Sequence, residues 1–348
     1  MTGLVFVLAT CAGQLGTPSL PSGAMPAAVS RAVDEATAPD LLAPVPTAPV
    51  VAPPPAPVAT PYSMTGGAPV NFGQVAKTRS PFESDHDFDG FVGPMTDPIQ
   101  AKDARALTEA RAIFLNNWAR PGTPVIGSGT YQVYAVQLRI ALSERFQVFV
   151  DKGWFLRFSP NPGKSVTGMM NLAGGAKYVF IRDEENQFLF SGAVQYEAPT
   201  GYANIYQNQG SGLLGVYGIF AKQFGDDWHL SGQFGENIAM QNQQNGYFYT
   251  HLHLDRRFGN FVPFFEANWF YYNQGAKYLP ASVGVEGAGA LDLGTAGFTG
   301  TSIVTLAPGF KYDFGQHMEF GCCYQFPVSD YKRSLYGNQL QAELIVRY

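Results

Sequence analysis

Residues 249–255 carry four side chains capable of acid–base or metal chemistry at every second position: Tyr249, His251, His253 and Asp255. Alternate residues of an extended strand share one face, so the histidines and the carboxylate would point the same way. A histidine beside a carboxylate is how many hydrolases activate a nucleophile. Because the chain has no G-x-S-x-G motif and no serine beside these residues, two histidines in a polar wall are the simpler interpretation.

Other residues with metal or redox chemistry are sparse. The chain has three cysteines; Cys322 and Cys323 are adjacent and would point to opposite faces of a strand, as small apolar fillers. The acidic run 84–90 resembles the first half of a calcium loop, but Thr96 stands where the loop needs its bidentate glutamate. We therefore interpret the run as a solvated acidic turn, and we expect no metal site and no cofactor.

Charged and polar residues recur opposite a face of apolar side chains. A basic residue facing lipid at mid-depth costs roughly 2–4 kcal/mol, so we expect the polar face to line a water-filled lumen and the apolar face to meet lipid. The charges would either set a transverse field that selects among solutes or simply pair with one another. The lumen-lining candidates are Arg139, Lys177, Glu197, His251, His253, Glu266, Lys311, Glu319, Glu343 and Arg347.

Period-two alternation positions these side chains, and it is clearest in the run 338–348, which ends on Tyr348. The strands are mostly about 11–13 residues long; tilted membrane strands need about 9–11 and globular strands average about 5–6. Short connections alternate with long ones, as in outer-membrane barrels. The predicted strands are 111–118, 130–142, 146–157, 169–181, 188–198, 213–224, 228–238, 247–257, 261–273, 301–312, 317–327 and 338–348.

These patterns predict an all-β fold, a transmembrane antiparallel up-and-down β-barrel of about 12 strands. The longest connection, 274–300, would fold inward as a constriction or cover the outer rim. Pro308 lies on the apolar face of a predicted central strand, where a proline removes a ladder hydrogen bond, so we expect a bulge there. About twelve strands enclose a narrower bore than a general porin, so the passage should be slim or partly plugged.

Composition agrees with this fold. Charged residues make up 14% and aromatic residues 14% of the chain, while the mean hydropathy is only −0.06. No run reaches the roughly 18 apolar residues of a membrane-spanning helix. A net charge of −5 argues against a nucleic-acid partner, which needs a basic surface.

The first third of the chain divides into three predicted segments. Residues 1–12 resemble an export signal cleaved after Ala12, with lipidation of Cys11 as the alternative. Residues 13–76 are rich in proline and alanine and should form a disordered periplasmic spacer, either a passive tether or a contact to the cell wall. Residues 77–110 would be a lead-in, with a helical turn or an extended stretch from Asp103, to the barrel at 111–348.

Four stretches carry a resemblance to a known family: 131–156 (YQVYAVQLRIALSERFQVFVDKGWFL), 176–201 (AKYVFIRDEENQFLFSGAVQYEAPTG) and the shorter HLHLDRRF and YQFPVSD. They resemble outer-membrane transporters related to the proteins of the meta-pathway of phenol degradation, over about residues 103–348. The resemblance implies an outer-membrane barrel and the passage of small organic molecules. Its motifs are strand and turn patterns rather than catalytic signatures.

We therefore expect a channel that lets small solutes, organic ones among them, cross the outer membrane without chemistry. The alternatives are a hydrolase built on a barrel and a structural envelope anchor acting through the spacer. The expected partners are outer-membrane lipid, small solutes, and the barrel-assembly machinery, which would recognise the last strand ending at Tyr348. The expected location is the outer membrane, with the spacer in the periplasm.

Overall fold

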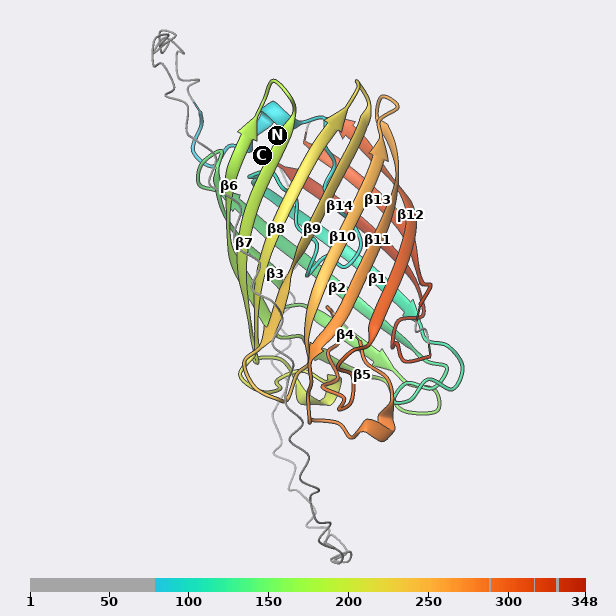
Figure 1. The fold of residues 1–348 in the computed structure, drawn as a ribbon. Coiled ribbons are helices and arrows are strands. Elements are labelled where there is room, and N and C mark those ends of the chain that lie inside the picture. Colours follow the sequence, from blue (N-terminus) through green and yellow to red (C-terminus); the bar gives the residue numbers. More distant parts are fainter. Residues whose placement is uncertain (1–78, 288, 316, 330–331) are drawn as a thin grey trace, which may run out of the picture. The chain divides into compact units, whose positions relative to one another are not determined.

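The computed structural model describes residues 79–287, 289–315, 317–329 and 332–348, so the signal and spacer predictions lie outside the described residues. Fourteen strand segments form one antiparallel sheet, which closes because β1 pairs with both β14 and β2 (Figure 1). The strands are β1 Glu109–Trp118, β2 Thr130–Ala141, β3 Phe146–Lys152, β4 Phe155–Ser159, β5 Val166–Met169, β6 Leu172–Asp183, β7 Phe188–Ala198, β8 Leu213–Phe224, β9 Trp228–Ala239, β10 Gly246–Arg256, β11 Phe261–Gln274, β12 Ser302–Gly315, β13 Met318–Pro327 and β14 Asn338–Arg347. Three short 3-10 helices are η1 His86–Phe88, η2 Ala203–Ile205 and η3 Ala281–Val283.

Two of the strands that build the wall are each broken into two segments. β3 and β4 both pair with β2, and β6 and β5 continue the sheet from them in the same way. Gly153, between β3 and β4, has φ +143°, a conformation that favours glycine. The Val136 carbonyl opposite this break accepts a 3.0 Å hydrogen bond from the Trp154 indole. With each broken pair counted as one strand, the barrel has twelve, as predicted.

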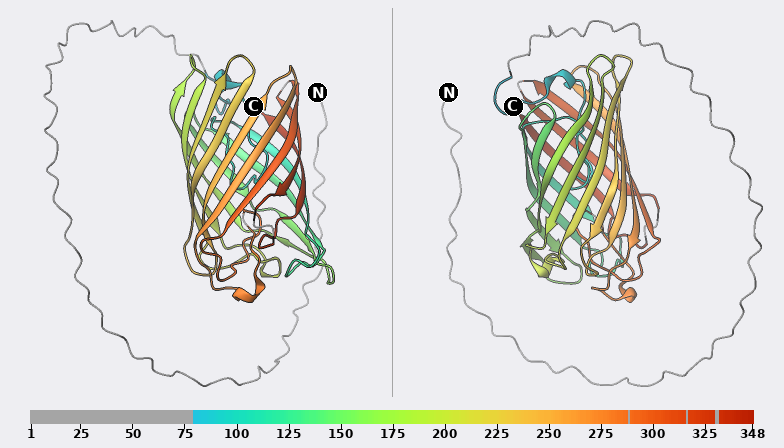
Figure 2. Two further views of the ribbon diagram at one scale, coloured as in Figure 1. Left: turned by 45° about the vertical axis from the view of Figure 1, so that its right-hand side comes forward. Right: turned by 60° about the vertical axis from the view of Figure 1, so that its left-hand side comes forward.

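Successive residues of each strand alternate between the inside and the outside of the barrel. In β2, Val136, Leu138 and Ile140 are exposed, whereas Gln137 and Arg139 are buried inside. The same alternation continues around the closed sheet of Figure 2, and the exposed large side chains are apolar while the buried inward ones are mostly polar. A continuous apolar exterior of this extent suits acyl chains rather than water. The structure thus places the polar face inside the barrel and the apolar face outside, while a water-filled lumen stays a prediction.

The predicted strand ranges agree with the structure to within a few residues, apart from the broken strands. β1 begins at Glu109, so the barrel starts two residues before the predicted 111. The predicted strands 146–157 and 169–181 are each interrupted, and β5 extends the second one back to Val166. The alternation changes phase at each break: Val150 and Phe155 are both exposed, as are Met169 and Leu172, although the members of each pair are an odd number of residues apart.

The bulge predicted at Pro308 is wrong. Pro308 lies opposite Phe265 of β11, and the register of β12 against β13 is the same on both sides of it. The ladder to β13 simply omits the pairs at Ala307 and Pro308, which is how the wall accommodates a residue without an N–H group. The register shift in β12 lies instead between Asp313 and Gly315, at the turn.

One rim of the barrel carries the short turns and the C-terminus. Tyr348 lies there, where its carbonyl accepts a 2.9 Å hydrogen bond from Ser84 N and its own N–H donates to Thr108 O at 2.9 Å. The opposite rim carries the long connections, including η2 and η3. Among the described residues, no helix is long and apolar enough to cross a membrane.

Candidate channel interior

A segment that precedes β1 crosses the inside of the barrel, drawn in cyan to teal in Figures 1 and 2. We call residues 84–108 the plug. Both of its ends lie at the short-turn rim beside Tyr348, and Asp85 N donates to Ala106 O at 2.9 Å across the base of the loop. Met95, in the middle of the plug, is fully buried. Only a lead-in is expected here from the sequence, so the plug is a feature that the sequence patterns did not predict.

The carboxylate of Glu266 on β11 holds the middle of the plug. Its oxygens accept hydrogen bonds from the backbone N–H groups of Met95 and Thr96, each at 2.7 Å, and from the Thr96 hydroxyl. Hydrogen bonds to an ionised acceptor contribute about 1.5–3 kcal/mol, more than neutral ones. Glu266 is therefore a main anchor of the plug.

Side-chain amides of the wall bind the plug backbone where it has no neighbouring strand. Gln233 accepts from Lys102 N at 2.9 Å and donates to Gln100 O at 2.8 Å, as a paired strand would. Gln137 donates to Pro98 O at 2.6 Å. A primary amide offers both donor and acceptor, so these side chains satisfy buried backbone groups of an irregular segment.

Charged side chains hold the returning half of the plug. Lys177 on β6 donates to the backbone carbonyls of Asp103 and Arg105. Lys102 of the plug lies 2.8 Å from the Asp151 carboxylate of β3, and Arg105 pairs with Asp103 at 2.7 Å. Because every one of these groups is buried, removing a single partner would leave an uncompensated charge.

The wall provides room for the plug at Gly321 of β13. A Cβ atom there would lie 3.1 Å from Met95 Sδ and 3.1 Å from Glu343 Cγ, so any side chain would press on the plug. Between the plug and the wall, beside Ile99 and Trp154, lies a cavity of about 20 Å³, enough for about one water molecule. At this level the lumen is filled.

The long connection from β11 to β12, residues 275–301, closes the lumen from the other end. We call it the β11–β12 loop. It is organised around Glu286, whose carboxylate accepts from the N–H groups of Gly287 (2.9 Å), Leu293 (2.5 Å) and Thr295 (2.7 Å) and from the Asn245 amide (2.6 Å). A buried carboxylate with four donors can hold a loop that has no regular secondary structure.

The β11–β12 loop packs inward. Leu291 and Leu293 belong to the same apolar cluster as Ile99 of the plug and Trp154 of the wall. Of the two alternatives that the sequence left open, the structure shows the inward one. Burial raises the pKa of the loop residue Asp292 to about 7, and burial together with the charge of Asp292 holds the pKa of Glu286 well above its usual range.

All ten predicted lumen residues lie on the inner face of the wall, and Arg347 is the one that is only partly buried. Lys177 binds plug carbonyls and His251 binds Asn268, whereas the other eight form ion pairs, so the geometry favours pairing over a free transverse field. Their role in lining a passage stays a prediction. The ion pairs among them and with their neighbours are Arg139–Glu109 (2.7 Å), Lys152–Glu197 (2.5 Å), Lys311–Glu319 (2.8 Å), Lys311–Glu343 (2.9 Å), Arg111–Glu343 (2.5 Å) and Arg347–Glu109 (3.0 Å).

Several partners in these pairs are absent from the predicted set. Glu109 lies just before the predicted start of the first strand, and Arg111 and Lys152 are not among the lumen candidates. Arg111 obeys the same alternation as those candidates, so the pattern contained its signal, whereas Lys152 is out of phase with its strand, at the register shift after Val150. Glu109 gave no such signal because it is the first residue of β1.

The acidic run 84–90 forms the start of the plug. Asp85 accepts a hydrogen bond from Asp87 N at the start of η1, and Arg182 of β6 pairs with both carboxylates, at 2.7 Å from Asp85. The prediction of a solvated turn is wrong for Asp85, which is buried. Two of the three aspartates in the run thus pair with a wall arginine that sequence spacing could not connect to them.

The two strand histidines lie in a buried polar cluster on β10 and β11. His253 has Glu266 2.7 Å from its Nδ1 and Asp255 3.2 Å from its Nε2, while His251 Nδ1 lies 2.7 Å from Asn268 Oδ1. Both ring nitrogens of His253 therefore face carboxylates rather than a hydroxyl nucleophile. This arrangement does not resemble the serine–histidine pair of the hydrolase alternative.

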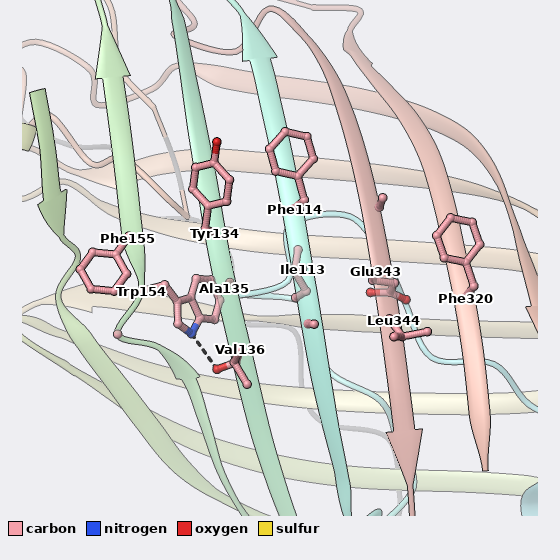
Figure 3. Close-up of a pocket in the computed structure, with 13 residues that line it drawn as sticks. Ile113, Phe114, Tyr134, Ala135, Val136, Trp154, Phe155, Phe320, Glu343 and Leu344 are labelled. Carbon is pink, nitrogen blue, oxygen red and sulfur yellow. Dashed lines mark hydrogen bonds between the residues drawn. The ribbon is translucent and has the colours of Figure 1, made fainter. Parts of the chain in front are cut away.

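The exterior has an apolar recess of about 610 Å³ where β2 and β4 diverge at Gly153 (Figure 3). Phe114, Tyr134, Phe155 and Leu344 surround it, and Figure 3 shows Trp154 beside Phe155, with its indole hydrogen bond to Val136. Because these side chains are apolar and lie on the outer face, the recess is a surface for acyl chains or another apolar group.

No protein-family model matches the chain, and no curated protein sequence matches it. Among solved structures, it is similar to an outer membrane channel from Pseudomonas putida F1, with 12% identity, a TM-score of 0.51, and coverage of 74% of this chain and 100% of the channel. The KdgM porin (7% identity, TM-score 0.43, covering 69% and 99%) and the NanC porin (7%, 0.42, 69% and 98%) also match. At 12% identity, the likeness to the Pseudomonas channel shows a shared fold, a β-barrel.

Proposed function

We propose that the chain is an outer-membrane channel for small solutes, organic ones among them, which pass through the polar interior once the plug has shifted. The observation that carries the proposal is the inverted distribution of side chains: apolar residues cover the exterior, and paired polar residues line the interior. A wall of this kind needs lipid outside and hydrated or hydrogen-bonded groups inside.

The contacts between plug and wall support an interior that opens. Most of the contacts described above are side-chain hydrogen bonds to plug backbone, such as those of Gln233 and Gln137. Water can replace the bonds of these neutral amides at low net cost, since a typical one contributes only about 0.5–1.5 kcal/mol, whereas the bonds of Glu266 and Lys177 are stronger. Phe88 and Phe91, in the first half of the plug, belong to one apolar cluster with wall residues such as Phe149, and these contacts anchor that half. Under this proposal, the conformation described here is the closed state.

The periplasmic side of the proposed channel is the rim with the short turns, where Tyr348 and the plug ends lie. Under this proposal, residues 13–76 form the periplasmic spacer after an export signal at residues 1–12. The last strand, ending at Tyr348, would be the element that the assembly machinery recognises.

The proposal is tested by reconstituting the full chain into liposomes and measuring swelling over a series of solutes of graded size. Heat-modifiable gel mobility provides the control that the barrel is folded. We expect swelling with the smallest solutes and a sharp fall with size, because the space beside the plug is narrow. Folded protein that admits no solute of the series, neutral or charged, would contradict the proposal.

A further inference from the structure

The carboxylates of one part of the wall have no lysine or arginine partner. Glu109, Glu197 and Glu343 each pair with a basic side chain. Asp255 and Glu266, on β10 and β11, form ion pairs in the described structure with histidines alone. Two buried carboxylates whose ionic partners are histidines can exchange an imidazole proton for a metal cation.

Two histidines and one of these carboxylates converge on a single point. His251 and His253 are two residues apart on β10 and share its inner face, while Glu266 lies directly opposite His253 on β11. Their ligand atoms all lie within 4.8 Å of one another, and all three side chains are buried. Neighbouring strands hold them rigidly, so little conformational entropy would be lost on binding an ion.

The hydrogen bonds of Asn268 fix the tautomer of His251. Asn268 Oδ1 accepts from the Tyr249 hydroxyl at 2.8 Å, and its Nδ2 group lies 2.9 Å from the Thr96 hydroxyl. The same Oδ1 lies 2.7 Å from His251 Nδ1, so that nitrogen carries the proton. Nε2 is then left with a lone pair, and it is a buried atom without a hydrogen-bond partner. That is the form of histidine that binds a metal ion.

Asp255 orients the imidazole of His253 as Asn268 orients that of His251. Asp255 lies 3.2 Å from His253 Nε2 and 2.7 Å from Nδ1 of His229, which places a carboxylate behind the imidazole. An Nε2–H donated to Asp255 would direct the His253 Nδ1 lone pair toward Glu266. Carboxylate–histidine pairs of this kind orient the ligands of zinc sites.

We propose that His251, His253 and Glu266 form a binding site for a divalent transition-metal ion such as Zn²⁺, with Asn268 and Asp255 as positioning residues. Two imidazoles and one carboxylate are the donor set that such ions favour, and three protein ligands leave a position for solvent. On binding, the ion takes the place of the proton shared between His253 and Glu266. Because Glu266 also binds Met95 and Thr96, the site and the plug share one ligand.

The test is a titration of the folded full chain in detergent with Co²⁺ and Zn²⁺, in competition with a chromophoric chelator. We expect one ion per chain. Bound Co²⁺ should give the visible absorption spectrum of an ion with few ligands, and Zn²⁺ should abolish that absorption by displacing Co²⁺. His251→Gln should weaken binding by about 100-fold or more, and Asn268→Ala by about 10–100-fold, the range found for outer-shell partners. Heat-modifiable mobility shows that each variant is folded.

The matched control is the double variant His86→Gln, His317→Gln. These two rim histidines are not among the proposed ligands, and their rings lie with centroids 6.4 Å apart. The control should bind Co²⁺ as the unmodified chain does. Folded chain that binds no Co²⁺ or Zn²⁺, or binding that survives His251→Gln but is lost in the rim variant, would overturn the proposal.

Discussion

Two stretches of the barrel wall hold their buried carboxylates in different ways. On β1, β13 and β14, Glu109, Glu319 and Glu343 are paired with arginine or lysine. On β10 and β11, Asp255 and Glu266 meet histidines, and Glu266 binds the plug backbone. An arginine or lysine pair stays charged at ordinary pH and is complete without the plug. The ion pairs of Asp255 and Glu266 depend on protonated histidines, and Glu266 also depends on the plug for its hydrogen bonds. A bound ligand or a displaced plug can therefore change the contacts on this side of the wall.

The largest effect is expected on the arginine and lysine side. Glu343→Gln leaves Arg111 without its carboxylate partner, while Lys311 keeps Glu319. Removing one partner of a buried ion pair costs about 3–5 kcal/mol, and we expect a loss of this order in the free energy of unfolding. Urea titration followed by tryptophan fluorescence measures it. Glu185→Gln in an exposed turn is the control and should change little.

The β11–β12 loop should respond to pH in a predictable direction. Burial raises the pKa of Asp292 to about 7 and that of Glu286 well above its usual range, so the inward loop binds protons more tightly than a solvated loop would. The inward state is therefore favoured by acid and loses stability as pH rises through about 7. Each tenfold difference in proton affinity between the two loop states contributes about 1.4 kcal/mol. Hydrogen exchange of the Leu293 and Thr295 amides, corrected for intrinsic rates, should show more protection at pH 5 than at pH 8.

Asp292→Asn sharpens this prediction. It removes the charge but keeps an acceptor for Gly294 N. We expect protection at pH 8 to approach that of the unmodified loop at pH 5. Asp226→Asn, in an exposed turn, is the control and should leave the pH dependence unchanged. Equal protection of the unmodified loop at the two pH values would contradict the account of Asp292 and Glu286.

The smallest effect is expected from Gly321→Ala. The added methyl group would lie 3.1 Å from Met95 Sδ, a flexible atom that can move by a few tenths of an ångström. Overpacking of this kind costs about 1 kcal/mol, here mainly at the expense of the plug position beside Glu266. Single-channel recording should show this displacement of the plug as a modest increase in the frequency of channel openings. Gly90→Ala, whose methyl group meets nothing closer than 3.4 Å, should behave as the unmodified chain.

The wall of the barrel could be predicted from sequence because its signal is local. Alternation in a strand such as 338–347 records directly which side chains meet lipid and which do not. The plug has no such period. Its backbone is bound by side chains distant in sequence, such as Gln233 and Glu266, and no pattern within residues 84–108 predicts those contacts. The apolar residues Phe88 and Met95, set among acidic and turn-forming residues, were the one hint of a buried segment.

The histidine cluster was half visible in the sequence. The two-residue spacing of His251 and His253 showed that they share a face, which raised the question of a catalytic role. Glu266 was recognised only as a lumen residue, because its place opposite His253 depends on the register of β10 against β11. Register across a turn, rather than residue type, is therefore what the sequence could not supply.

The central claim is that this barrel is a channel closed by its own plug. Single-channel recording in planar bilayers, comparing the unmodified chain with Glu266→Gln, tests it most directly. The variant weakens the hydrogen bonds to Met95 and Thr96 by about 1.5–3 kcal/mol, so we expect rare small openings in the unmodified chain and an open occupancy at least about tenfold higher in the variant. Silent bilayers from both proteins, each shown to be folded by heat-modifiable mobility, would contradict the account.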